Sequence, residues 1–316
     1  MKISDNYIIR DYKKGDEEGI TDLFESVFGK VMTVEQWRWK YLVPGGGRIY
    51  AKIAEDPSGK IIGYTGAVPL KGIFQNNVMP FFQIVDVMVH AKTRGHLGRK
   101  GVFEKLCKNL YADIGREESK VFCYGFPSAR HFKLGSIIGL YESVEQRAVD
   151  NIKNPVHSLF NVYTIKEISW DDNRLDSLWS ELSPNFSLSI IRDRNYLNWR
   201  YATNPFFSYQ LFGLFLLGKF KGWVILRDTG DEMLIVDFLF EKKRLKSIFT
   251  AIENFLVLIK IKSFRFWLPE TWRKTVSSYD QRETEAVVTN VVWKLPMPTD
   301  IVKKTFFYTM GDVDVF

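Results

Sequence analysis

Hydrophobic positions follow two different spacings along the chain, and each spacing predicts one kind of element. Short apolar runs, such as residues 83–90 and 233–240, are typical of buried strands. Apolar residues three and four positions apart, as in residues 16–28, are typical of helices. Because the two kinds of segment alternate along the chain, the sequence predicts an α/β protein in which helices flank a mixed, mostly antiparallel sheet.

The first half is predicted to have the order β α α β β β α β α β. Strands are expected at residues 7–12, 49–54, 60–68, 83–90, 120–124 and 141–148. Helices are expected at residues 16–28, 33–41 and 100–114 and from Ser128 onward. Thr33 can cap the second helix, and the turn Asp56-Pro57-Ser58-Gly59 is expected to join a hairpin.

The second half is predicted to repeat this order from about residue 161. Strands are expected at residues 163–169, 233–240, 263–268 and 286–294, with a hairpin at 209–227. Helices are expected at residues 172–182, 192–201, 245–259 and 271–278. A last strand at residues 305–316 has no counterpart in the first half.

Short motifs recur in the same order in both halves, which indicates a duplication. They are Trp39-Lys40-Tyr41 with Trp199-Arg200-Tyr201, Ile84-Val85-Asp86 with Ile235-Val236-Asp237, residues 99–110 with 245–256, and CYGFP at 123–127 with FWLP at 266–269. Asn154-Pro155 interrupts the pattern between them, so a linker is expected at residues 150–158. The sequence therefore predicts two domains, residues 1–150 and 159–316.

The composition limits the classes of ligand and partner that are expected. The net charge of +7 favours an anionic ligand, but the basic residues are scattered among acidic ones, which argues against nucleic acid. Two cysteines, Cys107 and Cys123, provide neither a disulfide framework nor a zinc cluster, so no metal is expected. The first residues lack an apolar signal core, and the apolar run at 209–217 is shorter than the roughly 20 residues that span a bilayer. A cytoplasmic protein without a membrane partner is expected.

The stretch TRGHLGRKGVF at residues 93–103 combines three glycines with basic side chains. It lies between a predicted strand and a predicted helix, where backbone N–H groups and the helix dipole attract anions. It matches neither a P-loop nor a dinucleotide-binding fingerprint. Two interpretations follow, a phosphate cradle and a basic turn in which the glycines serve turn geometry alone.

This order of elements, with a glycine-rich basic turn after the fourth strand, resembles the GNAT superfamily of acyl-CoA-dependent N-acetyltransferases. The resemblance rests on Val89-His90-Ala91-Lys92-Thr93-Arg94-Gly95 and on Gly125-Phe126-Pro127. It implies that acetyl-CoA lies between the fourth and fifth strands, and that the N–H of Val89 polarises the thioester carbonyl. The residues that the resemblance assigns to the cofactor are Val87, Met88, Val89, Arg94, Gly95, Gly98, Arg99, Lys100, Gly101, Val102 and Ser128.

The turn departs from the family pattern. Ala91 replaces a proline and Thr93 an aromatic residue, and the turn is longer, so that either Arg94-Gly95 or Arg99-Lys100-Gly101 could contact the pyrophosphate. Asp86 and Phe103 are 103 − 86 = 17 positions apart, whereas Asp237 and Phe249 are 249 − 237 = 12 apart, with no glycine between them. One cofactor site is therefore predicted, in the first half, and the second domain is expected to bind the acceptor or to be structural.

The general acid of the family is missing. The resemblance implies a tyrosine that acts as general acid four residues before Gly139, and this chain has Gly135 there. Tyr124, His131 and Tyr141 are the candidate replacements, each with a structural role as the alternative. Asp86 is a candidate base, but its repetition at Asp237 favours a structural hydrogen bond.

The sequence thus predicts an N-acetyltransferase that transfers an acetyl group from acetyl-CoA to the primary amine of a small acceptor, with an amino sugar as the leading candidate. One alternative is a Fem-like aminoacyl or long-chain acyl transferase. The other alternative, favoured by the missing tyrosine, is a non-catalytic acyl-CoA-binding or scaffold protein.

Overall fold

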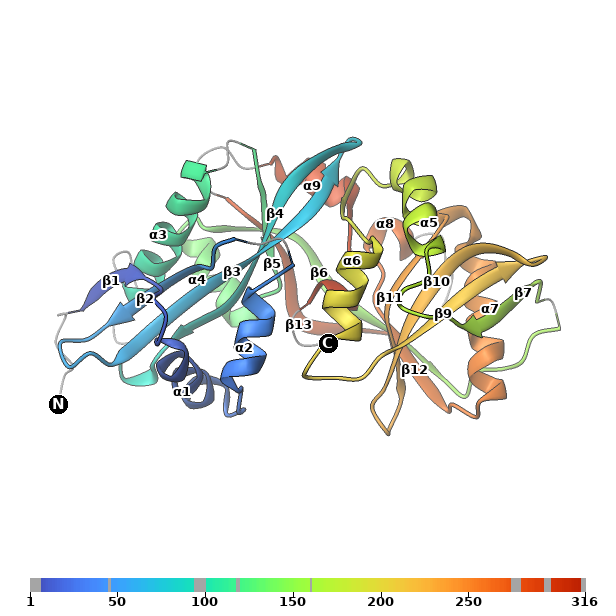
Figure 1. The fold of residues 1–316 in the computed structure, drawn as a ribbon, viewed down its shortest axis with the longest axis horizontal. Coiled ribbons are helices and arrows are strands. Elements are labelled where there is room, and N and C mark those ends of the chain that lie inside the picture. The colour runs from blue at the N-terminus through green and yellow to red at the C-terminus, as the bar shows by residue number, and fades with distance from the viewer. Residues whose placement is uncertain are drawn as a thin grey trace. The chain divides into compact units, whose positions relative to one another are not determined.

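The computed structural model describes residues 7–44, 47–93, 101–117, 120–159, 161–273, 280–292 and 297–313. The chain divides into two compact units, drawn in Figure 1. Unit 1 comprises Met1–Lys71, Met79–Val144 and Val287–Thr299, and unit 2 comprises Gly72–Val78, Glu145–Ala286 and Asp300–Phe316. No helix in the described ranges is long and apolar enough to cross a membrane.

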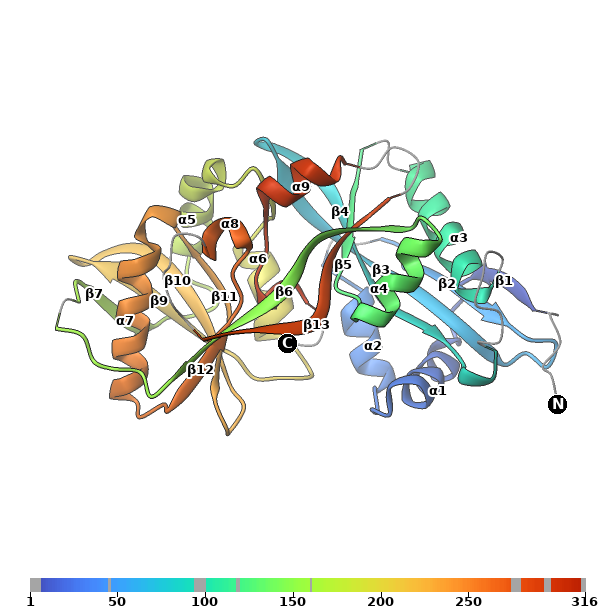
Figure 2. The same ribbon diagram turned by 180° about the vertical axis from the view of Figure 1, so that it is seen from behind.

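Unit 1 is a mixed sheet between two layers of helices. The strand order is β1 (Ile8–Asp11), β2 (Tyr50–Glu55), β3 (Ile61–Phe74), β4 (Asn77–Val89), β5 (Phe122–Gly125), β13 (Asp280–Val291) and β6 (Tyr141–Lys153). The helices are α1 (Glu17–Phe28), α2 (Val34–Tyr41), α3 (Val102–Glu117) and α4 (Ala129–Ile137). Helices α3 and α4 cover the sheet face that is turned to the viewer in Figure 2, and α1 and α2 cover the opposite face.

Two helices of unit 1, α2 and α4, begin at residues whose side chains cap them. Thr33 and Gln36 form a reciprocal capping box at the start of α2, which satisfies N–H groups that a helix end leaves without an internal partner. Ser128 caps α4 by accepting the backbone N–H of His131. Apolar residues of α3, including Leu106 and Leu110, are buried against the sheet.

Unit 2 repeats the arrangement. The strand order is β7 (Tyr163–Glu167), β9 (Gln210–Leu216), β10 (Lys219–Asp228), β11 (Met233–Phe240), β12 (Ser263–Phe266) and β6. The helices are α5 (Arg174–Leu182), α6 (Arg194–Leu197), which continues as a π-helical turn over Asn198–Ala202, α7 (Leu245–Leu258) and α8 (Glu270–Arg273). Each sheet contains a corresponding parallel pair, β4 with β5 in unit 1 and β11 with β12 in unit 2. The protein therefore has the tandem α/β architecture that the sequence predicted.

Neither unit is a continuous stretch of chain. Strand β13, from the end of the sequence, pairs with β5 through Thr289↔Gly125 and Asn290↔Tyr124. Strand β6, from the first half, pairs with β12 through Ser263↔Lys153 and Phe266↔Asp150. Each half therefore gives its last strand to the sheet that the other half begins.

Several predicted elements were wrong in detail. The strand expected at residues 305–316 is α9 (Thr299–Thr305), the short β14 (Phe306–Phe307) and a 3₁₀ turn, Met310–Asp312, which Thr309 caps. Only Phe306 and Phe307 of this segment pair as a strand, in parallel with Leu188 and Ser189, and its apolar residues are buried. Strands β3 and β4 extend beyond their predicted ends to meet at Gln75 and Asn76, whose φ values of 49° and 65° form a tight turn. Strand β6 runs on to Lys153, through the start of the expected linker, and β8 (Leu188–Ile190) was missed.

Candidate functional site

Strand β4 is distorted at Asp86. This residue has φ +50°, a conformation that L-residues rarely adopt within a strand. Its carboxylate accepts hydrogen bonds from Lys40 Nζ at 3.0 and 3.1 Å and from Tyr41 Oη at 2.8 Å, both on α2. The side chain is 4% exposed, although the residue as a whole is half-buried, so the accessible part of Asp86 is largely main chain. The carboxylate thus anchors a kink that presents backbone to solvent.

The second half repeats this anchor. Tyr201 Oη donates to Asp237 Oδ2 at 2.8 Å, as Tyr41 does to Asp86. The basic partner differs, because Asp237 is paired with Arg192 Nε at 3.1 Å rather than with the residue that follows the repeated tryptophan. The Tyr–Asp bond is therefore a feature of both halves, whereas Lys40 belongs to the first alone.

Strands β4 and β5 part in the middle of unit 1. Their pairing covers Phe81↔Phe122, Phe82↔Cys123 and Gln83↔Tyr124, and β4 then continues to Val89. The residues predicted to bind pantetheine lie on this continuation: Val87 and Val89 are half-buried and Met88 is buried. His90 donates its backbone N–H to Ile62 O on β3 at 2.9 Å.

Helix α3 begins beside this edge. Lys105 donates its N–H to Gly101 O at 3.1 Å, so Gly101 opens the first turn, while the side chain of Val102 is buried against Ala54 and Leu106. The other predicted loop residues, Arg94, Gly95, Gly98, Arg99 and Lys100, lie outside the described residues. Backbone N–H groups in the first turn of a helix, together with its dipole, favour an anion.

Gly135 on α4 is covered by the ring of Tyr141. A Cβ placed on Gly135 would lie 2.1 Å from Cδ2 of Tyr141, far closer than atoms approach. The tyrosine from β6 therefore fills the space that a side chain at position 135 would need. Tyr141 was a candidate general acid, but nothing in the sequence indicated that its ring would occupy the space beside position 135.

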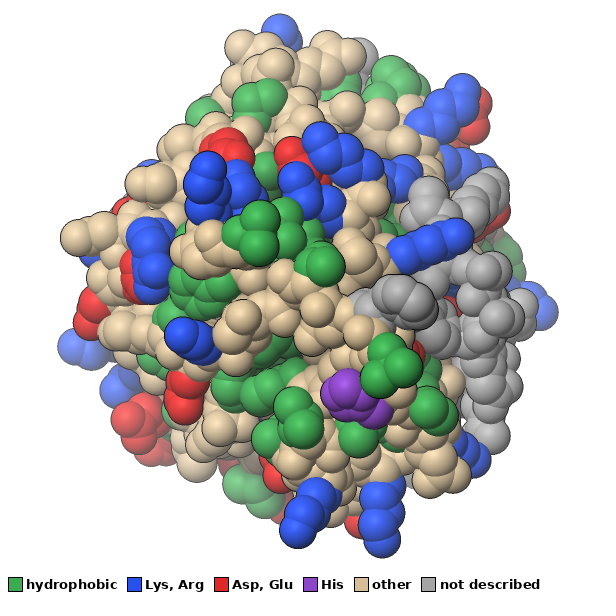
Figure 3. Space-filling model, turned by 90° about the vertical axis from the view of Figure 1, so that its right-hand side faces the viewer, with side chains coloured by type: hydrophobic (Ala, Val, Ile, Leu, Met, Phe, Trp, Pro, Cys, Tyr) green, Lys and Arg blue, Asp and Glu red, His purple; other side chains and the backbone are tan. Residues whose placement is uncertain are grey.

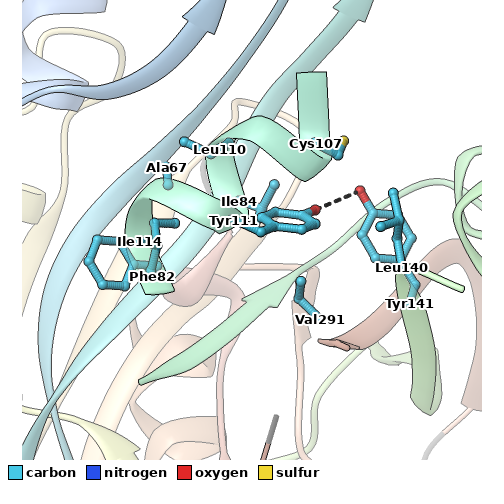
Figure 4. Packing of buried hydrophobic residues seen from close by; sticks show 10 residues of the cluster. All are labelled: Ala67, Phe82, Ile84, Cys107, Leu110, Tyr111, Ile114, Leu140, Tyr141 and Val291. Carbon is cyan, nitrogen blue, oxygen red and sulfur yellow. Dashed lines mark hydrogen bonds between the residues drawn. The ribbon is translucent and has the colours of Figure 1, made fainter. Parts of the chain in front are cut away.

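Tyr141 belongs to a buried polar cluster under α3 and α4. Its hydroxyl lies 3.5 Å from the hydroxyl of Tyr111, drawn as a dashed line in Figure 4, and 3.5 Å from His131 Nε2. Burial raises the pKa of Tyr141 well above its usual value and raises that of the neighbouring Cys107 thiol to about 12. Burial also lowers the pKa of His131 to about 4. At neutral pH, His131 is therefore uncharged and Tyr141 keeps its proton.

Tyr124 faces the other side of the sheet. Neighbouring strand residues alternate in direction, and Cys123 packs against the cluster under α3. Tyr124 is fully buried, with its ring stacked 5.4 Å from that of Phe122. The predicted catalytic residues are thus divided, with His131 and Tyr141 on the α3 face and Asp86 and Tyr124 on the α2 face.

In unit 2 the strand that corresponds to β4 is β11, and the described residues of β11 are not accessible. All eight residues of β11 are buried, and a 3₁₀ turn, Lys242–Arg244, leads from it directly into α7. The C-terminal segment packs over the repeated pair: Thr309 Oγ1 donates to Asp237 Oδ1 at 2.9 Å, and Arg200 donates to the carbonyl oxygens of Gly311 and Val313. Sequence reasoning missed this segment, although Thr309 and Asp312 have the spacing of a capping box. Among the described residues, no group of three His, Cys, Asp or Glu side chains could hold a metal ion.

Residues 8–134 match the family model of the acetyltransferase (GNAT) domain. No curated protein matches the chain. A conserved protein from Enterococcus faecalis V583, described as a probable N-acyltransferase, is 17% identical, with a TM-score of 0.67 over 90% of this chain and 72% of its own.

Two further structures are similar over almost the whole chain. A GCN5-related N-acetyltransferase from Anabaena variabilis has a TM-score of 0.68 at 13% identity, over 90% of this chain and 72% of its own. The N-myristoyltransferase of Saccharomyces cerevisiae, solved with bound myristoyl-CoA, has a TM-score of 0.61 at 9% identity. The likeness covers 92% of this chain and 83% of its own. The chain therefore has the tandem fold of these structures, and its residues 8–134 match the acetyltransferase (GNAT) domain family.

Proposed function

We propose that unit 1 transfers an acetyl group from acetyl-CoA to the primary amine of a small acceptor, and that an amino sugar is the leading candidate. The observation that carries this proposal is the edge of β4, where Asp86 turns the strand and the main chain from Ile84 to Val89 continues beyond its pairing with β5. The amide groups of pantetheine can pair with such an edge as an added strand would.

The start of α3 is the proposed pyrophosphate site. Gly101 opens a helix of 16 residues, so its first-turn N–H groups supply partial positive charge. Arg94, Arg99 and Lys100 would add full charges, and Gly95 and Gly98 would let the backbone curve around the phosphates. The buried β11 and its glycine-free connection to α7 support a single cofactor site, in unit 1.

Tyr141 is the proposed general acid. The amine nitrogen attacks the thioester carbon, the C–N bond forms, the C–S bond breaks, and the departing sulfur takes the proton of the Tyr141 hydroxyl. The amine must lose its own proton to a base, commonly through water. His131, which is uncharged at neutral pH, would accept a hydrogen bond from Tyr141 and position it. We assign Asp86 a positioning role, because Lys40 and Tyr41 already engage its carboxylate.

The test is Tyr141→Phe, which keeps the ring over Gly135 and removes only the hydroxyl. We expect release of free CoA thiol with an amine panel to fall about 10²- to 10⁴-fold, the usual range for a lost proton donor. Acetyl-CoA should still raise the melting temperature of the variant, because a ligand that binds the folded state stabilises it. Unchanged thiol release would rule out Tyr141 as the acid. Absence of a thermal shift in the unmutated protein would refute the cofactor assignment.

A longer acyl group is the second candidate. It is favoured by the likeness to the N-myristoyltransferase with bound myristoyl-CoA, which extends over 92% of this chain. Thermal shifts measured with acyl-CoAs of increasing chain length separate the two candidates. A shift that is largest with acetyl-CoA supports acetyl transfer, and one that grows with chain length supports the alternative.

A further inference from the structure

Arg227, near the end of β10, is a half-buried arginine that lies over an aromatic ring. Its guanidinium carbon is 3.4 Å from the centre of the Phe207 ring. Leu226 pairs with Gln210 of β9, so Tyr209 is the cross-strand neighbour of Arg227. Stacking on a ring leaves the edge of a guanidinium, with its N–H groups, available to a carboxylate or phosphate.

The other arginines of unit 2 whose side chains are described have partners. Arg200 donates to the carbonyl oxygens of Gly311 and Val313. Figure 3 shows the same tendency on one face of the molecule, where Lys and Arg side chains lie next to Asp and Glu side chains at several places. In the part of the chain that the structure describes, the guanidinium of Arg227 has neither an ion pair nor a hydrogen bond. Six arginines of the unit form ion pairs with Asp or Glu: Arg174, Arg192, Arg194, Arg244, Arg265 and Arg273.

The acidic residues nearest to Arg227 in the chain are engaged elsewhere. Asp228 accepts the backbone N–H of Gly230 at 2.8 Å in the β10–β11 turn. Glu232 pairs with Arg265. Burial lowers the pKa of Arg227, and no carboxylate among the described residues raises it. The charge is therefore partly removed from water without the compensation that an anion gives.

The loop that carries Phe207 is held in place by its own hydrogen bonds. Asn204 Oδ1 accepts the backbone N–H groups of Phe206 and Phe207, at 2.8 and 3.1 Å. Asn204 Nδ2 donates to Arg200 O at 3.0 Å. Arg200 belongs to the π-helical turn Asn198–Ala202, and such turns are frequent at functional sites. The ring under the guanidinium is thus fixed before any ligand arrives, which lowers the entropy lost on binding.

We propose that Arg227, stacked on Phe207, binds a carboxylate or phosphate group of a ligand. A guanidinium binds both groups through paired N–H···O bonds. Two sources share this chemistry: an acceptor that carries the amine and the anion in one molecule, and a separate anion. The first source rests on the proposed function, and it narrows the acceptor to anionic amines such as an amino sugar with a phosphate or a carboxylate.

The experiment is isothermal titration calorimetry of the full chain with saturating CoA, which fills the proposed pyrophosphate site. The amine probes are glucosamine, glucosamine 6-phosphate and muramic acid, which carry no anion, a phosphate and a carboxylate. The free anions are inorganic phosphate and acetate. Arg227→Met should weaken the binding of the anionic probes about tenfold to a hundredfold, the usual loss when a charged hydrogen-bond partner is removed. The affinity for glucosamine should not change.

Arg174→Met is the matched control. The guanidinium carbon of Arg174 also lies over phenylalanine rings, 5.2 Å from the centre of Phe215 and 5.1 Å from that of Phe220, but Arg174 is already paired with Asp172. Loss of this charge should leave the affinity for every probe unchanged. Arg227→Lys keeps the charge without the paired donors, so its affinity should lie between those of Arg227→Met and the unmutated protein. All three variants should melt like the unmutated protein.

The probes also distinguish the two sources of the anion. Tighter binding of an anionic amine than of its free anion assigns the group to the acceptor, and equal binding assigns it to a separate anion. The proposal is overturned if no anionic probe binds the unmutated protein, or if Arg227→Met and Arg174→Met behave alike. The readout is binding rather than thiol release. A chain that binds these anions through Arg227 but releases no thiol would therefore refute the proposed function alone.

Discussion

At the scale of single residues, the same polar pair has been kept twice while its surroundings changed. Tyr41 and Asp86 in unit 1, and Tyr201 and Asp237 in unit 2, each share a hydrogen bond of 2.8 Å. In unit 1 the bonded aspartate kinks β4 and leaves main chain accessible. In unit 2 Thr309, near the C-terminal end of the described residues, also donates to the aspartate, and the carboxylate is fully buried. The repeated residues therefore maintain the fold, and their neighbours decide where a ligand can approach.

His131 should make the stability of the protein depend on pH. Its pKa is about 4 in the folded state, because of burial, and about 6.5 in an unfolded chain. As pH falls below 6.5, the unfolded state binds a proton that the folded state excludes. The free energy of unfolding therefore falls between about pH 6.5 and 4, and this contribution is constant below 4.

The measurement is chemical denaturation at several pH values. Between pH 6.5 and 4, the unmutated protein should lose on the order of 2 kcal/mol more stability than His131→Asn. Parallel curves for the unmutated protein and His131→Asn would contradict the burial of this ring.

At the scale of elements, the packing of α4 on β6 depends on a missing side chain. Gly135→Ala places a Cβ where the Tyr141 ring lies, and the ring must move. We expect a loss of about 1–3 kcal/mol of stability, the usual cost of overpacking. Loss of thiol release should accompany it, because the Tyr141 hydroxyl would be displaced.

Gly115 of α3 is the matched control. It is also helical, but a Cβ there would meet no heavy atom within 4 Å. Gly115→Ala should stabilise the protein by about 0.5–1 kcal/mol, because alanine has the higher helix propensity. Equal effects of the two substitutions in thermal and chemical denaturation would show that Tyr141 does not pack on Gly135.

Local sequence patterns predicted the helices and strands better than they predicted which distant segments contact each other. The range 233–240 matched β11 residue for residue, because its apolar run ends abruptly at charged residues. Thr33 was correctly expected to cap α2, since its chemistry acts within one turn. The packing of Tyr141 on Gly135 and the hydrogen bond from Thr309 to Asp237 could not be predicted, because periodicity does not indicate which distant segments contact each other. The strand expected at residues 305–316 failed for the same reason.

At the scale of the whole molecule, each half of the chain contributes a strand to the sheet of the other: β13 pairs with β5, and β6 pairs with β12. The first half lacks β13, which pairs with β5. A fragment of residues 1–150 should therefore melt without a cooperative transition, because the β5 edge would be unpaired and apolar residues of β5 such as Phe122 would lose cover. Calorimetry and circular dichroism would check this, with the full chain as the control. A sharp transition in the fragment would mean that the first domain folds alone.

The exchange of strands also sets the order of events during synthesis. Thr289 Oγ1 bonds Gly125 O across 164 positions of sequence. At roughly 5–20 residues per second, a ribosome needs on the order of ten seconds or more to make the chain between them. Throughout that interval the nascent first half exposes a strand edge, which is the kind of surface that chaperones bind and that aggregates through edge pairing. Unit 1, although most of it is encoded first, is completed only after the residues of β13 have been made.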